Sequence, residues 1–196
     1  MSAAHDIHVG TSGFFFRGWV GPFYPAGMPS SDFLEYYARQ FPVVEVNSTY
    51  YGIPKPRVLA NMARRTPQGF RFVVKLHKSM THEPKLDLAK VREFLDAIAP
   101  LKLAGKYDGL LAQFPWGFRR DTASKAHLEA LRESFPDEPI SVGVTSSSGI
   151  QTTKEIPAAV ETPCRGVDAL LDSGVRHFFD QDADLHGLLT PPIRVD

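Results

Sequence analysis

Short apolar runs alternate with longer amphipathic runs over the first 144 residues, and no other feature constrains the fold as strongly. Such alternation of strand-length and helix-length segments is typical of parallel β/α units. The predicted strands are Ile7–Ser12, Val43–Thr49, Phe70–His77, Leu110–Phe114 and Ile140–Val144. The predicted helices lie in FLEYYARQF, RVLANMARR, KLDLAKVREFLDAIAPL and ASKAHLEALRESF. The sequence therefore predicts an α/β fold whose five strands build part of a parallel β/α barrel.

Residues suited to helix starts stand before these amphipathic runs. Ser31 is a candidate cap for the first helix, because its hydroxyl can accept a bond from a free backbone N–H. Pro54 and Pro56 stand where the second helix opens, a place that tolerates proline. Asp121 or Thr122 can cap the fourth helix.

Polar residues occur toward the C-terminal ends of three predicted strands, although strands buried on both faces are usually continuous apolar runs. Side chains alternate along a strand, so every second residue shares a face. If the apolar faces pack on helices, the side chains pointing into the barrel are Glu45, Asn47, Lys75, His77 and Gln113. Active sites of such barrels lie at this end of the strands. The pattern predicts a polar site there.

Glu45 and Lys75 are expected on adjacent strands, where they can form an ion pair and act as general acid and base. The alternative is an ion pair that only fills the barrel interior. His77 is a candidate base or a donor to an anionic ligand, or else a residue bonded to a nearby loop. Asn47 and Gln113 are candidates for orienting a ligand.

The GTSG turn offers backbone N–H groups and the hydroxyls of Thr11 and Ser12, which can hold an anion or simply form a tight turn. The aromatic loop that follows either builds a small core of its own or stacks on a ligand, and Trp19 fits both interpretations equally. Tyr50 and Tyr51 are expected at the same rim, just past the second strand.

Composition narrows the class of partner. The chain has 22 basic and 22 acidic residues, so it has no bulk attraction for nucleic acid or anionic membranes. A single cysteine, Cys164, favours a reducing compartment, and neither a signal peptide nor a membrane-length apolar run is evident. We therefore expect a cytoplasmic protein without a membrane partner.

No cofactor is indicated by the sequence. The spacing of His77, His82 and Glu45 matches no zinc template, so no metal site is predicted. The dinucleotide, Walker, nucleophile-elbow and C-x-x-C motifs do not occur.

Several motifs occur in the order of a known family: GTSG followed by Trp, FYP, LEYYA, VEVNSTYY, TPQGFRFVVKLHKSMTH and LLAQFPWGF. Between about Val9 and Phe135 the chain resembles the YecE-like family, the domain of unknown function numbered seventy-two. The resemblance implies a TIM-type barrel with a polar pocket at the strand C-termini, and no established activity. It adds weight to Glu45, Lys75 and His77 as catalytic candidates. The ligand-binding candidates are Thr11, Ser12, Trp19, Asn47, Thr49, Tyr50, His82 and Gln113.

The resemblance ends at about Val142. The family places Glu, an apolar residue, Arg and His after the fifth strand, whereas GVTSSSG follows Val142 here. Codons for residues 143–148, read one base later, can encode Glu-Leu-Arg-His-Arg. We hypothesise a reading-frame shift near Gly143, which resequencing the gene would test.

This hypothesis divides the chain into three parts. Residues 1–142 form the barrel part, residues 143–166 a divergent loop or disordered segment, and residues 167–196 a partial barrel unit and C-terminal tail. The family's later strand and closing helices are missing, so we expect a truncated barrel of at most six strands. Its open edges would allow self-association.

The leading interpretation is a site for a small polar or anionic molecule, with the question of catalysis left open. One alternative is a nucleic-acid-binding module, which the neutral charge disfavours. Its candidate contacts are Trp19, Tyr50, Tyr51, Arg64, Arg65, Arg119 and Arg120. Another alternative is a non-functional, truncated family member.

Overall fold

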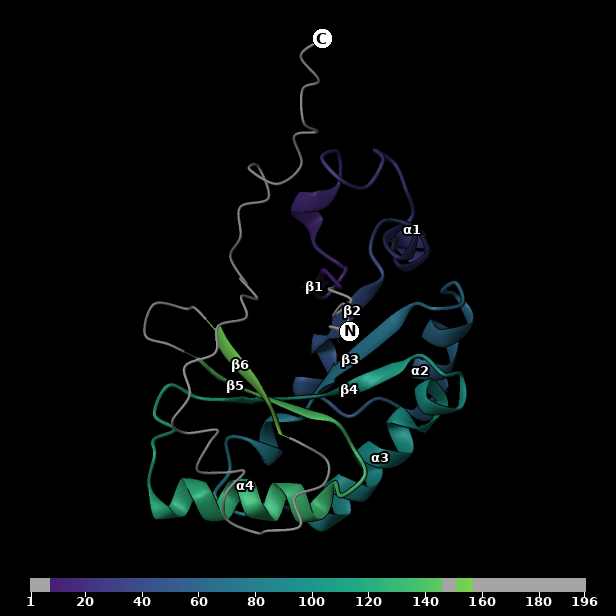
Figure 1. The fold of residues 1–196 in the computed structure, drawn as a ribbon. Helices are drawn as coiled ribbons and strands as arrows, with labels where there is room; N and C mark the ends of the chain where they lie inside the picture. The colour runs from purple at the N-terminus through teal and green to yellow at the C-terminus, as the bar shows by residue number, and fades with distance from the viewer. Residues whose placement is uncertain (1–7, 146–150, 157–196) are drawn as a thin grey trace, which may run out of the picture.

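The structure is a computed structural model that describes residues 8–145 and 151–156. Its sheet has six strands, which lie side by side in chain order (Figure 1). The strands are β1 (Gly10–Ser12), β2 (Val43–Val46), β3 (Arg71–Lys75), β4 (Tyr107–Phe114), β5 (Ile140–Thr145) and β6 (Gln151–Ile156). The first five are parallel, and β6 runs antiparallel to β5.

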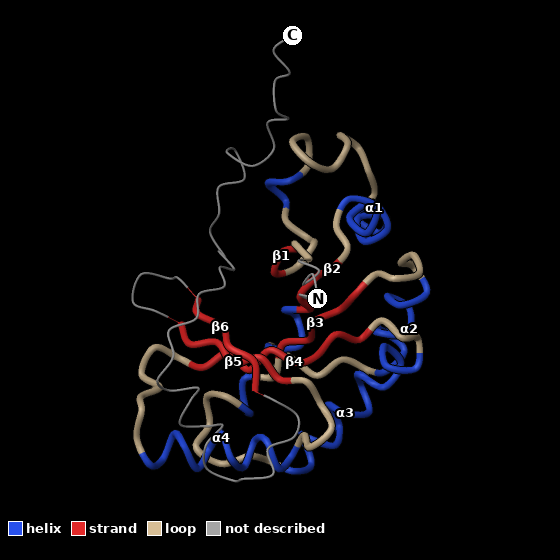
Figure 2. The backbone as a smooth tube through the Cα atoms, viewed as in Figure 1, coloured by secondary structure: helices blue, strands red, loops and turns tan. Residues whose placement is uncertain are grey.

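Four α-helices connect the parallel strands. They are α1 (Phe33–Gln40), α2 (Pro56–Arg64), α3 (Leu88–Leu103) and α4 (Thr122–Ser134). The sheet curves, and the helices lie along its outer side (Figure 2). The sheet described does not close on itself, so the fold is an incomplete TIM-type β/α barrel, as predicted.

The hydrophobic core lies between the outer face of the sheet and the helices. Alternate strand residues supply the sheet's share, which is Val44, Val46, Phe72, Val74, Leu110, Ala112, Phe114, Ile140 and Val142. Burying each large apolar side chain contributes about 1.5–3 kcal/mol. Because alternation sends the apolar residues outward, the intervening residues of the same strands point inward.

Gly109 lets β4 pair with both of its neighbours. The pairing of β3 with β4 shifts register between Phe72 and Val73. Gly109 has a φ of +132°, and a Cβ atom there would lie 2.9 Å from the carbonyl oxygen of Pro139. A glycine is therefore required at this close approach.

A capping aspartate begins α4, and a proline begins α2. The Asp121 carboxylate accepts a 2.8 Å bond from the backbone N–H of Ser124, so Asp121 is the cap of α4. Pro56 is the first residue of α2, as the sequence predicts. The prediction for Ser31 is wrong: Ser31 lies in a short 3-10 helix before α1, and its hydroxyl donates to Asp32 Oδ1.

Three predicted strands are shorter than expected. The strand predicted over Ile7–Ser12 begins only at Gly10, because His8 and Val9 lie outside β1. The strand predicted over Val43–Thr49 ends at Val46, and a 3-10 helix, η3 (Asn47–Tyr50), follows. Thr49 stabilises this turn, because its hydroxyl lies 2.7 Å from the Val46 carbonyl oxygen and 2.6 Å from that of Lys75. Strand β3 likewise ends at Lys75. Strand alternation therefore does not extend to Asn47, Thr49 or His77.

The segment after β5 also differs from its prediction in part. Loop or disorder is predicted over residues 143–166, whereas residues 143–145 still belong to β5 and Gln151–Ile156 form β6. Pairing with β6 supplies the β5 edge with backbone hydrogen bonds. The rest of that segment, the predicted partial barrel unit over 167–196 and Ile7 of the first predicted strand lie outside the described residues.

A buried polar group also occurs at the opposite end of the barrel, where β4 and β5 begin. Lys102 Nζ lies 2.6 Å from Glu138 Oε1, and the Arg132 guanidinium donates a 2.9 Å bond to the Glu138 carbonyl oxygen. Burial, followed by the Glu138 charge, raises the pKa of the Tyr107 hydroxyl above its ordinary value. These contacts link α3 and α4 to the segment that precedes β5.

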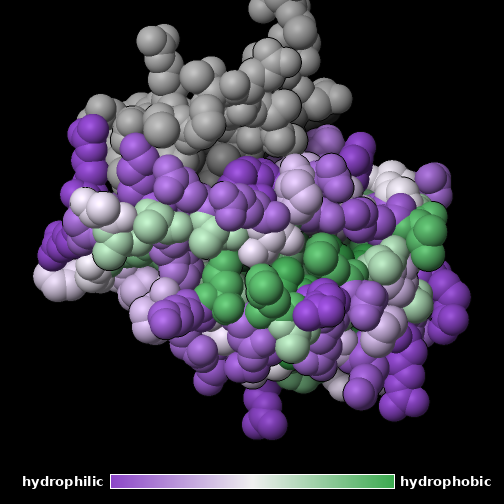
Figure 3. Space-filling model, turned by 90° about the horizontal axis from the view of Figure 1, so that it is seen from below, coloured by the Kyte–Doolittle hydropathy of each residue, from purple (hydrophilic) through white to green (hydrophobic). Residues whose placement is uncertain are grey.

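Hydrophobic side chains form a band across the face seen from below in Figure 3, with hydrophilic residues around it. Individual apolar residues are exposed elsewhere among the described residues, and Leu103 at the end of α3 is the most exposed of them. None of the helices described has the length and apolar character that crossing a membrane requires.

Candidate functional site

Glu45 and Lys75 form a buried ion pair at the C-terminal ends of β2 and β3. Lys75 Nζ lies 3.5 Å from Glu45 Oε1, and the side chains are 5% and 2% exposed, respectively. The Ser12 hydroxyl, at the end of β1, donates a 2.8 Å hydrogen bond to the same oxygen. Three neighbouring strands thus bring their last inward-facing polar residues to one place, and the pairing predicted for Glu45 and Lys75 is confirmed.

The pair leaves hydrogen-bonding capacity unused. Glu45 Oε2 is buried and has no hydrogen-bond partner among the described residues. The separation of 3.5 Å between Lys75 Nζ and Glu45 Oε1 exceeds the usual 2.7–2.9 Å of a charge-assisted hydrogen bond. Buried polar groups of this kind are normally satisfied, so the arrangement is one in which a bound molecule can supply the missing contacts.

Tyr50 and His82 lie beside the pair on its solvent side. Lys75 Nζ is 5.6 Å from the centre of the Tyr50 ring. The Tyr50 hydroxyl lies 3.2 Å from His82 Nε2, and His82 Nδ1 lies 2.8 Å from the Thr81 hydroxyl. A chain of polar groups therefore connects the buried ammonium region to the loop after β3.

The surroundings change the proton affinity of these two residues. Burial lowers the pKa of His82 below its ordinary value, and the Lys75 charge lowers it further. Burial also raises the pKa of the Tyr50 hydroxyl. His82 is therefore a neutral imidazole at neutral pH, able to accept a proton or to hold the phenol in place.

Gln113, on β4, is buried and lies farther along the inner face. A Cβ atom on Gly143 of β5 would lie 2.9 Å from Gln113 Oε1, so the amide fills the space that a larger residue at 143 would occupy. Register pairs Gln113 with Gly143, and Lys75 with Leu111.

Three further candidates are Thr11, Thr49 and Asn47, and the hydrogen bonds of Thr11 and Thr49 do not go to the side chains of the ion pair. Thr11 bonds to Tyr37, on the helix side of the sheet, through both its N–H and its hydroxyl. Thr49 bonds only to backbone carbonyls, at Val46 and Lys75. Asn47 is half-buried at the start of η3.

His77 and Trp19 also lie apart from the pair. His77 Nδ1 accepts from the backbone N–H of Ser79, so the residue caps a short 3-10 helix. Burial, then the charges of Lys90 and Lys78, lowers the pKa of His77. The Trp19 ring lies 4.6 Å from that of Phe16, within an aromatic cluster that packs on the core.

Sequence reasoning missed the contact between Tyr50 and Lys75 and the role of Thr81 in orienting His82. No strand periodicity links these residues, because Tyr50 lies in η3, Lys75 is the last residue of β3, and Thr81 and His82 follow the turn after β3. The only signal was polar and aromatic composition just past two strand ends. In the residues described, no three His, Cys, Asp or Glu side chains form a group that would hold a metal ion.

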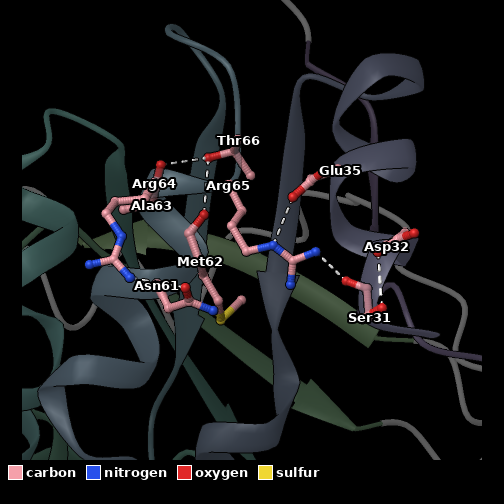
Figure 4. A network of polar contacts seen from close by, with 9 residues as sticks. All are labelled: Ser31, Asp32, Glu35, Asn61, Met62, Ala63, Arg64, Arg65 and Thr66. Carbon is pink, nitrogen blue, oxygen red and sulfur yellow. Dashed lines mark hydrogen bonds and ion pairs between the residues drawn. The ribbon is translucent and has the colours of Figure 1, made fainter. Parts of the chain in front are cut away.

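The two arginines at the C-terminal end of α2, Arg64 and Arg65, have structural partners. Arg65 Nε lies 2.9 Å from Glu35 Oε1, and the same guanidinium donates to the Ser31 carbonyl oxygen (Figure 4). Arg64 donates a 3.1 Å bond to Asn61 within its own helix. The Arg65 contacts join α2 to the segment at the start of α1, so this side chain is engaged in holding two elements together.

A family model described as "Protein of unknown function DUF72" matches residues 8–162, most of the chain. The chain belongs to the DUF72 family. The resemblance inferred from the motifs is thereby confirmed, and the match extends past Val142, after which the sequence analysis expects the family pattern to be lost. The reading-frame hypothesis stays a prediction.

Relatives and solved structures agree with this membership. The chain is 27% identical over 139 residues to the UPF0759 protein YunF of Bacillus subtilis, covering 68% of this chain and 48% of that protein. It is 42% identical over 72 residues to the UPF0759 protein YecE of Escherichia coli K12, covering 35% of this chain and 26% of that protein.

A crystal structure of a DUF72 family protein from Thermotoga maritima is similar, with a TM-score of 0.64 and 38% identity. The similarity covers 72% of this DUF72 chain and 56% of that one. A DUF72 family protein from Enterococcus faecalis is also similar, with a TM-score of 0.53 and 29% identity over 60% of this chain and 49% of that one. The regions that match thus cover about half the length of YunF and about a quarter of that of YecE.

Proposed function

We propose that this DUF72 protein binds a small polar or anionic molecule at the C-terminal ends of its strands. The observation that carries this proposal is the buried Glu45–Lys75 pair, in which one carboxylate oxygen has no hydrogen-bond partner within residues 8–145 and 151–156. Removing both charges from water costs several kcal/mol per ion, and good packing alone would favour apolar residues there. Charges kept at such a cost, at the end of the barrel where sites form, support a role in ligand handling.

In this proposal Glu45 and Lys75 are the groups able to exchange protons with the ligand. Tyr50 lies between them and the imidazole of His82, which accepts or donates a hydrogen bond at the Tyr50 hydroxyl. Ser12 holds the Glu45 carboxylate in orientation. In this proposal His82, a ligand-binding candidate of the sequence, takes the role beside the pair that the sequence analysis gave to His77.

A thermal-shift screen of metabolites and metal ions on the intact chain tests the proposal. We expect at least one polar or anionic compound to raise Tm in the wild type and to lose that effect in Glu45→Gln and Lys75→Ala. Glu35→Gln is the matched control, because Glu35 also pairs with a basic residue but is far more exposed. An effect that persists in both site variants would contradict the proposal.

We also propose a cytoplasmic location and self-association through the free sheet edge. The single cysteine supports a reducing compartment. In the described part of the sheet β1 has a partner strand on one side only, and an unpaired edge favours association. Size-exclusion chromatography with light scattering tests this, and a monomer at all concentrations would contradict it.

A further inference from the structure

At the C-terminal ends of β2 and β3, the Glu45 carboxylate can accept further hydrogen bonds. The Lys75 ammonium beside it can donate further ones. Both polar partners of Glu45 approach the same oxygen: the Ser12 hydroxyl at 2.8 Å and Lys75 Nζ at 3.5 Å from Oε1. Among the residues described, Oε2 is buried and has no donor. The Lys75 ammonium has three N–H groups, and it lies next to that Oε1 oxygen and the Tyr50 ring.

We propose that the ligand carries a hydroxyl or ammonium group on the carbon next to a carboxylate. Its donor group would bond to Glu45 Oε2, and its carboxylate would accept from Lys75 Nζ. The chemical class is that of small α-hydroxy and α-amino acids. This inference rests on the proposed function and specifies its ligand.

Charge and hydrogen bonding exclude simpler ligands. A plain carboxylate satisfies Lys75 but leaves Glu45 Oε2 unpaired and adds a second negative charge close to it. An uncharged diol satisfies Glu45 but offers the ammonium only a neutral oxygen. Leaving a buried acceptor unpaired costs about 1–3 kcal/mol, which is why both halves of the ligand are needed.

The neighbouring side chains suit such a ligand. Tyr50 and His82 are more exposed than Lys75, and the Tyr50 hydroxyl lies 3.2 Å from His82 Nε2. Lys75 Nζ lies 5.6 Å from the centre of the Tyr50 ring and 3.5 Å from Glu45 Oε1. A carboxylate held by Lys75 would therefore lie near both the phenol and the Glu45 carboxylate.

Three nearly isosteric probes test the inference: L-lactate, L-alanine and propionate, with 1,2-propanediol as the uncharged comparison. Binding is followed by NMR titration of the intact chain. We expect lactate or alanine to bind at least about tenfold more tightly than propionate, a difference of about 1.4 kcal/mol. Comparing lactate with alanine shows whether the ligand group that donates to Glu45 is a hydroxyl or an ammonium.

Site variants assign the two halves of the contact. Glu45→Gln is expected to abolish the preference over propionate, and Lys75→Met to weaken all three carboxylates. Glu35→Gln should change neither. If Glu45→Gln does not fold, Glu45→Asp is used instead. Its side chain is shorter by one methylene group, so its carboxylate lies farther from the donor group of the ligand.

The outcomes separate this inference from the proposed function. Propionate binding as tightly as lactate and alanine overturns the inference and leaves the proposed site standing. The same holds if none of the probes binds while another compound in the metabolite screen does. If no compound in either experiment binds, both are overturned.

Discussion

The hydroxyl of Tyr50 lies 3.2 Å from Nε2 of His82, although the two residues stand 32 positions apart in the chain. Tyr50 comes from η3 after β2, and His82 from the turn after β3. The bond joins two loops beside the buried Glu45–Lys75 pair, where Lys75 Nζ lies 5.6 Å from the centre of the Tyr50 ring. The pKa of His82 therefore responds to the charge of Lys75.

Replacing Lys75 with Met should raise the pKa of His82. Burial is the larger cause of its lowered pKa and the Lys75 charge the smaller, so the pKa moves part of the way back toward 6.5. NMR titration of the histidine side chains measures this. Because the pKa of His82 is lower in the folded than in the unfolded protein, the unfolded state binds the proton more tightly, and stability falls as the pH drops below about 6.5. The variant has a smaller difference between the two pKa values, so it should lose less stability on acidification than the wild type.

His77 is the internal control in the same spectra. Its pKa is lowered by burial and by Lys90 and Lys78, not by Lys75, so it should titrate unchanged in the variant. Equal movement of both histidines would point to a general loosening of the fold instead.

Removing one partner of the buried pair should be costly. Lys75→Met leaves the Glu45 carboxylate buried without its countercharge, which we expect to cost about 3–5 kcal/mol of unfolding free energy. The double variant Glu45→Gln, Lys75→Met should cost less than the sum of the two single variants, because it leaves no buried charge. Urea denaturation of all four proteins measures the coupling, and strict additivity would show that the two groups do not interact.

The exposed pair of Arg65 and Glu35 provides the comparison for that cycle. Arg65 Nε lies 2.9 Å from Glu35 Oε1, which is a closer approach than in the buried pair. Because both side chains are partly in water, we expect a coupling of only about 0.2–1 kcal/mol. If the Arg65–Glu35 coupling energy were larger than that of Glu45 and Lys75, burial would not be what makes an ion pair strong in this protein.

Gly10→Ala should destabilise the edge of the sheet. A Cβ atom at Gly10 would lie 2.1 Å from the carbonyl oxygen of Val43, so β1 must move away from β2. We expect a loss of about 1–3 kcal/mol or more in urea denaturation. Gly117→Ala is the control, because no atom lies within 4 Å of its added methyl group, and it should be close to neutral.

The cap of α4 should confer a pH-dependent stability. The backbone N–H of Ser124 lowers the pKa of Asp121 below its ordinary value of 3.8, so the ionised side chain is favoured in the folded state. The contribution is present above 3.8 and is lost as the pH falls through the lower, folded-state pKa. Asp121→Ala should therefore lower Tm at neutral pH and make less difference in strong acid.

Asp121→Asn separates the charge from the hydrogen bond in thermal melts. Asn also caps helices well, so it should retain most of the stability and show no corresponding loss on acidification. A decrease in Tm in Asp121→Asn as large as in Asp121→Ala, at neutral pH, would indicate that the charge alone is responsible.

Strand periodicity was sufficient to place Glu45 and Lys75. Both lie inside regular strands, where alternation fixes the facing of each side chain, and both are buried on the inner face. Gln113 follows from the same reasoning on β4. For Asn47 and His77 the reasoning fails, because β2 and β3 end before these residues are reached.

The sequence by itself determined the order of strands and helices, the family and the candidates within strands, because apolar periodicity and local motifs are properties of neighbouring residues. Only the tertiary structure decided that Tyr50 and His82 meet above Lys75 and that Ser12 and Lys75 approach the same Glu45 oxygen. It also decided that Gln151–Ile156 pair with β5 as an antiparallel strand. These contacts join segments far apart in the chain through loops and strand edges, where no local pattern specifies the partner.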